Sequence, residues 1–272
     1  MYDGALQTMQ RADGAATVRF AGAGADTRLA DLAQRGAAKA MLPRTHTCVP
    51  EVVFLNTAGG LTGGDRLTYT LDLPDGGMAT AATQTAERIY DAGGGVARMD
   101  VSLSLGDGAR LDWLPQETIL FDSCALERET TVTLGADATY LGIETLVLGR
   151  KAMGEVVRSV SLKDRRRVLR GGVPVVIEPL ALEADALAGD GPAVLGGATV
   201  QSTLLFVGPG AEDAIGPVRA VLDESGVRAA ASAWNGRLVV RLLGADSWPV
   251  RRVAARILTV LRKDPLPRVW QL

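Results

Sequence analysis

Residues 55–73, LNTAGGLTGGDRLTYTLDL, contain the two features that decide the fold, a glycine-rich corner and an alternating run. Four glycines, at positions 59, 60, 63 and 64, come before Asp65. From Leu67 to Leu73 apolar side chains alternate with Thr and Asp, a period typical of a half-buried β-strand. Because glycine adopts positive φ angles and permits close backbone approach, we predict a tight corner that leads into a strand and aims the carboxylate of Asp65.

The glycine run does not have the spacing of a phosphate-binding loop. Such loops lead into a helix and usually contain Gly-Lys-Ser/Thr or G-x-G-x-x-G. Here Gly64 is followed by Asp65, Arg66 and a strand pattern. We therefore expect a bulged corner between strands, with an acidic functional corner as the alternative.

The composition indicates one cytoplasmic domain, residues 1–272, that binds neither nucleic acid nor membrane. The chain has 29 Lys and Arg against 31 Asp and Glu, so it lacks the basic field of a nucleic-acid-binding protein. Two cysteines are too few to staple a chain of this length, and the first residues do not have the pattern of a signal peptide. The apolar runs are too short to cross a bilayer.

The scarcity of histidine excludes several classes of enzyme. His46 is the only histidine, and the motifs G-x-S-x-G, H-E-x-x-H and paired C-x-x-C are absent from the sequence. A standard hydrolase site or a structural zinc site is therefore not expected.

The rest of the chain reads as many strands and two helices. Alternation over Met99–Leu105, followed by Gly106-Asp107-Gly108 and the apolar Leu111 and Trp113, predicts a hairpin. Further strand patterns occupy residues 130–134, 156–162, 173–177, 204–207 and 237–243. Helical spacing of apolar residues predicts helices over Ala211–Ser225 and Ser247–Leu261.

Several motifs in series resemble the UreD (UreH) family of urease accessory proteins. They are NTAGGLTGGD at 56–65, TQTAERIY at 83–90, LDWLPQETILF at 111–121, IETLVLGRKAMGE at 143–155 and PRVW at 267–270. The resemblance runs in order over nearly the whole chain, and LPQET between two β patterns is its most characteristic part. It implies a mainly β fold of stacked, helix-like or sandwich-like sheets with two α-helices.

The resemblance also implies a function without catalysis. Proteins of this family bind UreF and, with the GTPase UreG, form a complex that docks on apo-urease and delivers nickel to it. An internal channel for the ion is proposed for the family. On this basis we expect a chaperone of nickel insertion that acts in a protein complex.

The residue types present favour a transient rather than a tightly bound nickel ion. Stable nickel sites usually recruit imidazole or thiolate, and only His46, Cys48 and Cys124 offer these groups. His46 and Cys48 could face one metal ion from a strand, but two ligands do not complete a site, and we assign them no role. An ion that must be passed on is better held by oxygen ligands that release it.

Four carboxylates are candidates for this path: Asp65, Glu87, Glu144 and Glu178. Glu144 and Glu178 lie in strongly apolar runs, where an ionised carboxylate needs a partner, a water-filled passage or a cation. The alternative for each is a structural ion pair with an arginine such as Arg88 or Arg150.

Two further hypotheses stay open from the sequence. Arg252 and Arg256 on the second helix, together with Trp270, could bind a partner, or the helix could simply cover the protein's own sheets. Alternatively, the chain is a β-rich carbohydrate-active enzyme in which Asp65 and Glu87 supply acid/base chemistry.

Overall fold

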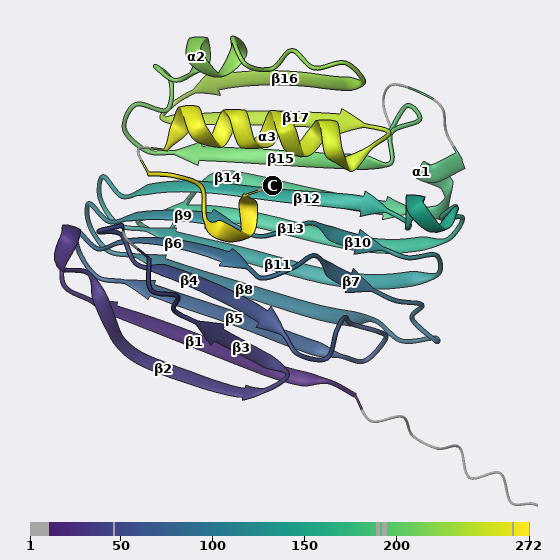
Figure 1. Ribbon diagram of the computed structural model, residues 1–272, viewed down its shortest axis with the longest axis horizontal. Coiled ribbons are helices and arrows are strands. Elements are labelled where there is room, and N and C mark those ends of the chain that lie inside the picture. Colours follow the sequence, from purple (N-terminus) through teal and green to yellow (C-terminus); the bar gives the residue numbers. More distant parts are fainter. Residues whose placement is uncertain (1–10, 46, 189–190, 192–194, 263, 272) are drawn as a thin grey trace, which may run out of the picture.

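The protein consists of two stacked β-sheets with one long helix on the outside of the larger sheet (Figure 1). The computed structural model describes residues 11–45, 47–188, 191, 195–262 and 264–271. The seven-stranded sheet has the order β14-β13-β11-β8-β5-β1-β2, with β1 Asp13–Ala21, β2 Arg28–Gly36, β5 Arg66–Leu73, β8 Ala97–Leu105, β11 Cys124–Leu134, β13 Val160–Arg170 and β14 Val173–Glu183.

The second sheet has ten strands, eight of them in the order β16-β17-β15-β12-β9-β6-β4-β3. Their bounds are β3 Ala38–Met41, β4 Glu51–Asn56, β6 Met78–Thr83, β9 Arg110–Leu114, β12 Thr139–Leu148, β15 Val200–Val207, β16 Val227–Trp234 and β17 Arg237–Gly244. Two short strands, β7 Glu87–Ile89 and β10 Thr118–Leu120, pair with each other, and β10 also pairs with β12.

In the middle of the molecule the chain winds like a solenoid. Successive long strands alternate between the two sheets, and β5, β8, β11 and β13 are parallel neighbours in one sheet while β6, β9 and β12 are parallel neighbours in the other. The mainly β fold with stacked, helix-like sheets is thereby confirmed. The predicted hairpin after Met99–Leu105 is wrong, because Gly106-Asp107-Gly108 carries the chain from β8 in one sheet to β9 in the other.

Aspartates stack the corners of successive coils. Asp75 Oδ1 accepts a hydrogen bond of 2.8 Å from the Asp107 amide, and Asp107 Oδ1 accepts one of 2.8 Å from the Ala136 amide. A Cβ atom on Gly106 would lie 2.4 Å from Asp75 Oδ1, and one on Gly135 would lie 2.4 Å from Asp107 Oδ1. Glycine at these two positions therefore lets each coil approach the carboxylate of the coil before it.

Two apolar cores follow from the alternation of the strands. The inward residues of β5, Leu67, Tyr69, Leu71 and Leu73, are buried between the sheets, as the sequence predicted. The opposite face of the larger sheet packs against helix α3, Ser247–Leu261, whose bounds match the prediction (Figure 1). The Asp246 carboxylate caps α3 by accepting a hydrogen bond of 2.9 Å from the Trp248 amide.

The predicted helix over residues 211–225 is much shorter than expected. Only α2, Ile215–Arg219, is α-helical, and turns flank it on both sides. Gly216 and Pro217 lie inside it, and both residue types oppose propagation of a helix. A further helix of five residues, α1 Ala184–Ala188, was not predicted. No helix in the described part of the chain is long and apolar enough to span a bilayer.

Candidate functional site

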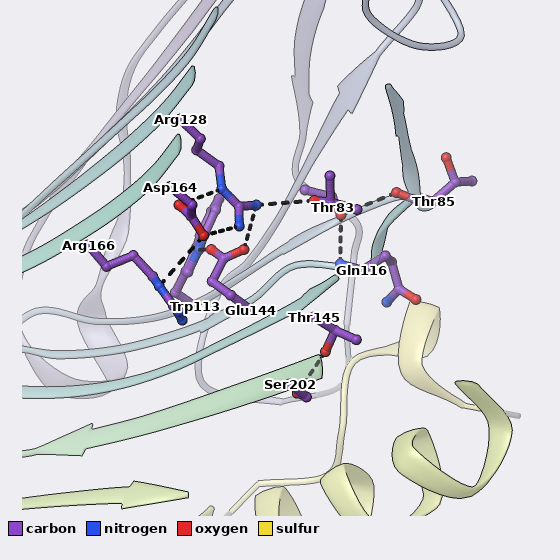
Figure 2. A network of polar contacts seen from close by, with 11 residues as sticks. Thr83, Thr85, Trp113, Gln116, Arg128, Glu144, Thr145, Asp164, Arg166 and Ser202 are labelled. Atoms are coloured by element: carbon purple, nitrogen blue, oxygen red, sulfur yellow. Dashed lines mark hydrogen bonds and ion pairs between the residues drawn. The ribbon is translucent and has the colours of Figure 1, made fainter. Parts of the chain in front are cut away.

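A network of charged side chains lies between the two sheets, and Arg128 is at its centre (Figure 2). Arg128 belongs to β11 and is 4% exposed. Its guanidinium forms two hydrogen bonds with Asp164 of β13, from Nε to Oδ1 at 3.0 Å and from Nη2 to Oδ2 at 2.7 Å. Its Nη1 lies 2.8 Å from Oε2 of Glu144 on β12 and 3.1 Å from Oγ1 of Thr118. Arg128 therefore links strands of both sheets.

Glu144 is held from a second side by an aromatic donor. The indole Nε1 of Trp113, on β9, donates a hydrogen bond of 3.1 Å to Glu144 Oε1. Trp113 is fully buried and Glu144 is 8% exposed. Each oxygen of this carboxylate thus has a donor, which satisfies the requirement of an ionised group in an apolar interior.

The network continues from Asp164 toward the surface. Arg166 Nε lies 3.8 Å from Asp164 Oδ2, and Arg166 Nη2 lies 4.0 Å from Glu178 Oε1. The same Glu178 oxygen lies 2.7 Å from Nη2 of Arg241, whose side chain is 59% exposed. We call the six residues Arg128, Glu144, Asp164, Arg166, Glu178 and Arg241 the interior network. Acids and guanidinium groups alternate along it from the core to solvent.

Electrostatics in the interior network favour the charged forms. Burial alone would raise the pKa of Asp164, but the neighbouring Arg128 guanidinium outweighs burial and holds this pKa below its usual range. Burial likewise opposes the charge on Arg128, and the carboxylates of Asp164 and Glu144 overcome that effect and raise its pKa. The buried ions therefore stabilise one another.

Asp65, at the glycine corner, is occupied by backbone donors. Its Oδ1 accepts a hydrogen bond of 2.7 Å from the Ala12 amide, and its Oδ2 accepts one of 2.8 Å from the Thr62 amide. The side chain thus ties the corner to the residues before β1. A Cβ atom on Gly63 would lie 2.0 Å from the Ala92 carbonyl oxygen, so the corner packs directly against the next coil.

Glu87, on β7, lies apart from the interior network beside a small cavity. Its Oε1 accepts a hydrogen bond of 3.0 Å from Asn56 Nδ2. Burial raises the pKa of Glu87 to about 7, against weaker lowering by the Asn56 and Arg88 contacts. The cavity, of about 30 Å³, is also lined by Tyr69 and Gln84, and a volume of this size is enough for about one or two water molecules.

The structure brings two of the four predicted carboxylates, Glu144 and Glu178, into one network, and it leaves Asp65 and Glu87 outside it. The ion-pair alternative holds for Glu144 and Glu178, but their partners are Arg128 and Arg241 rather than Arg88 or Arg150.

The sequence reasoning missed Arg128, Asp164 and Arg166. A signal was present, because all three occupy inward positions of alternating strands, between Leu126 and Val132 and between Leu162 and Val168. A charged residue at an inward position indicates a buried polar partner.

The predicted partner-binding residues make contacts within the chain. Arg252 Nη2 and Arg256 Nη1 lie 2.5 Å and 2.8 Å from the two oxygens of Glu224. Trp270 is 4% exposed, and its Nε1 donates a hydrogen bond of 2.8 Å to the Leu114 carbonyl. The buried face of α3 covers the larger sheet, as the alternative hypothesis stated.

The sulfur and imidazole groups do not assemble into a site within the described residues. His46 lies outside them, Cys48 is exposed and Cys124 is buried. Burial raises the pKa of the Cys124 thiol to about 12. The described residues contain no group of three His, Cys, Asp or Glu side chains placed to hold a metal ion.

Comparison with known proteins identifies the relatives of this chain. The model of the family described as UreD urease accessory protein matches residues 12–271. A urease accessory protein UreD from Cereibacter sphaeroides is 58% identical over 264 residues, which cover 97% of this chain and 96% of the relative. The corresponding protein from Dinoroseobacter shibae is 54% identical over 97% of this chain and 94% of its own length. One from Jannaschia sp. is 49% identical over the full length of both chains.

Proposed function

The chain belongs to the UreD family of urease accessory proteins and so serves urease maturation, and from this premise we propose that it is a non-catalytic scaffold that binds UreF and UreG and assists nickel delivery into apo-urease. The complex acts in the cytoplasm, and nickel is its cargo rather than a resident cofactor. The observation that carries the proposal is the match to this family over residues 12–271. We assign the entry of the nickel path to Glu178, the outermost acid of the interior network.

A carboxylate can support temporary handling of a divalent cation, because it is a weaker ligand for nickel than imidazole or thiolate and therefore releases the ion more readily. Within the interior network Glu178 is the acid available for this role, since the oxygens of Glu144 and Asp164 are held by Arg128 and Trp113. Glu178 is the acid of the network nearest to solvent, because its side chain is 11% exposed, against 8% for Glu144 and 0% for Asp164, and its partner Arg241 is 59% exposed. The exposed guanidinium of Arg241 can move away without the burial of a new charge, and Glu178 is then available to an incoming ion.

We include Glu87 in the proposed path and leave Asp65 out of it. Glu87 lies beside a cavity. Because its pKa is raised to about 7, its carboxyl group can gain or lose a proton near neutral pH. Both oxygens of Asp65 accept backbone hydrogen bonds, so a cation there would have to compete with two donors. Asp65 is therefore assigned a structural role.

A carbohydrate-active enzyme is the weaker interpretation. It needs two carboxylates that act on one substrate. Asp65 is committed to the Ala12 and Thr62 amides, and Glu87 accepts from Asn56 beside a cavity of about 30 Å³, which is far below the 300–1,000 Å³ of usual small-molecule sites.

The proposal is tested in cells that express urease with its accessory proteins and lack this chain. Each variant is supplied in turn, urease is purified, and its nickel content and activity are measured. Glu178→Gln and Glu87→Gln should lower the nickel content of urease while UreF and UreG still co-purify with the variant. The matched control is Glu183→Gln, an exposed acid on the same strand as Glu178.

Two results separate the parts of the proposal. Normal nickel content in both Gln variants would contradict the path and leave the scaffold intact. Failure of the unchanged chain to co-purify with UreF or UreG would contradict the scaffold itself.

A further inference from the structure

A second polar cluster lies on the larger sheet, away from the interior network. It surrounds a pocket of about 230 Å³ between the start of β4 and the chain that follows α3. Glu51 and Thr80 lie at the sheet, and Arg262 approaches them from the end of α3. None of these residues belongs to the proposed nickel path, so the pocket needs an explanation of its own.

Glu51 is a mostly buried residue whose carboxylate has no partner among the residues that the structure describes. It is the first residue of β4 and is 8% exposed. Its side chain forms no hydrogen bond or ion pair with any residue that the structure describes, although it lines the pocket. Burial raises its pKa, and the charge of Arg262 only partly offsets this effect. A carboxylate in this state is stabilised by any donor that enters the pocket.

Arg262 is close to the pocket but directs its donors elsewhere. Its Nη1 donates to Asp112 Oδ2 at 2.6 Å, and its Nη2 donates to Thr80 Oγ1 at 3.3 Å and to the Pro265 carbonyl at 3.1 Å. Its Nε donates to the Asp264 carbonyl at 3.4 Å. Its pKa is lowered, first by burial, which disfavours the charged form. Arg262 therefore supplies a distant charge to Glu51 and no direct contact.

The walls and the rim of the pocket differ in character. Val49, Pro265 and Leu266 supply apolar wall surface. Arg44 and Arg268, both exposed, stand at the rim. The alkyl part of a lysine or arginine side chain fits between such apolar walls, and its cationic end can then reach the carboxylate of Glu51. The rim guanidinium groups then favour acidic neighbours on either side of that basic side chain.

We propose that this pocket binds an arginine or lysine side chain of a partner protein, flanked by acidic residues, with Glu51 as the acceptor at its floor. The flanking acids contact Arg44 and Arg268, and the alkyl part packs against the apolar walls. A basic side chain that fills a desolvated pocket is a common anchor of protein interfaces. This inference does not depend on nickel transport, and it fails or succeeds separately from it.

The test uses the full chain and the peptide acetyl-Asp-Arg-Asp-amide as the probe. Binding is followed by the chemical shifts of the backbone amides of the ¹⁵N-labelled protein. We expect saturable shifts around β4 and residues 264–271. A control peptide with citrulline in place of arginine has nearly the same shape but no charge. It should bind at least about 10-fold more weakly, because a charged donor forms a stronger hydrogen bond to a carboxylate than a neutral donor does.

Variants locate the contacts. Glu51→Gln should weaken the arginine peptide at least about 10-fold, whereas Glu183→Gln should leave its affinity unchanged. Arg44→Ala combined with Arg268→Ala should weaken the acidic peptide and have no effect on acetyl-Ala-Arg-Ala-amide. Equal affinity of the arginine and citrulline peptides, or an unchanged affinity in Glu51→Gln, would overturn the proposal.

Two basic residues next to the pocket in sequence, His46 and Lys263, lie outside the described residues. The variants His46→Ala and Lys263→Ala test whether a side chain of this chain is the true occupant. Under the proposal both variants bind the probe as the unchanged chain does. If either variant binds it about 10-fold more tightly, the pocket is filled from within and the inference of an external side chain is wrong.

Discussion

Arg128 of β11 and Glu144 of β12 form a buried ion pair that joins the two sheets, with 2.8 Å between Nη1 and Oε2. The exposed fractions of the two side chains are 3% and 8%. The same guanidinium also contacts Asp164 of β13, with 2.7 Å between Nη2 and Oδ2, and the residues around these groups in the core are mostly apolar. We infer that this pair helps to set how one sheet lies over the other.

Removal of the Arg128 charge should destabilise the fold strongly. Arg128→Met keeps most of the side-chain volume but leaves the carboxylates of Glu144 and Asp164 buried without their main partner. Breaking a buried ion pair in this way costs about 3–5 kcal/mol. Urea unfolding should therefore show a free energy of unfolding lower by this amount.

The control for Arg128 is Arg165, which directly follows Asp164 on the adjacent strand β13 and points outward. Arg165 is exposed on β13, and Arg165→Met should change the free energy of unfolding by less than about 0.5 kcal/mol. If Arg128→Met lowers the free energy of unfolding by less than about 1 kcal/mol, the buried pair does not stabilise the fold as we infer.

Asp65 should act as a structural residue of the glycine corner. Asp65→Ala removes the acceptors of two backbone amides, those of Ala12 and Thr62, and each buried donor without a partner costs about 1–3 kcal/mol. Asp65→Asn retains one acceptor oxygen and should lose less. Thermal or urea unfolding checks this order, with Asp100→Ala, an exposed aspartate of β8, as the matched control. Equal stability of Asp65→Ala and the unchanged chain would refute the assignment.

The sequence predicts the strands well but not how they connect. Alternation places Leu67 and Tyr69 on a buried face, and both are buried in the core. It does not reveal whether the next strand turns back into the same sheet or crosses to the other. The turn at Gly106-Asp107-Gly108 has the composition of a hairpin, yet β8 pairs with β5 and β11. The deciding contacts, such as Asp75 with the Asp107 amide, connect residues 32 positions apart.

The same limit applies to the interior network. Glu144 and Glu178 stand out in the sequence because they are acids in apolar runs. Their partners cannot be deduced locally, since Arg128 and Asp164 are 36 residues apart and meet only because β11 and β13 are parallel neighbours. The register of the coils, rather than any short motif, decides which charges meet.

Arg252 and Arg256 provide a test of the outer surface of α3. Both pair with Glu224, and Arg256 also donates hydrogen bonds to the carbonyls of Val221 and Asp223. The double variant Arg252→Ala with Arg256→Ala should therefore lose about 1–2 kcal/mol of stability and remain folded. If this surface binds UreF, co-purification of UreF should fall in the double variant and persist in Arg158→Ala, an exposed arginine outside the helix. If UreF co-purifies with both variants, the outer surface of α3 is not the UreF interface.

Glu87 should make stability depend on pH in a direction opposite to that of most acids. Its pKa is raised from 4.5 to about 7 in the folded protein, chiefly by burial. Between these two pH values the folded state binds a proton that the unfolded state has lost. The stabilisation from Glu87 is therefore complete below about pH 4.5 and is lost as the pH rises through about 7, a change on the order of 3 kcal/mol.

Glu87→Gln removes this titration and keeps a group that can hydrogen-bond to Asn56. Urea unfolding at pH 5, 6, 7 and 8 should show that the unchanged chain loses stability relative to Glu87→Gln from pH 5 to 7, and that the difference is constant above about pH 8. The comparison between the two proteins cancels the titration of all other groups. A difference that does not vary with pH would mean that Glu87 is ionised throughout this range, and the proposed proton exchange beside the cavity would be wrong.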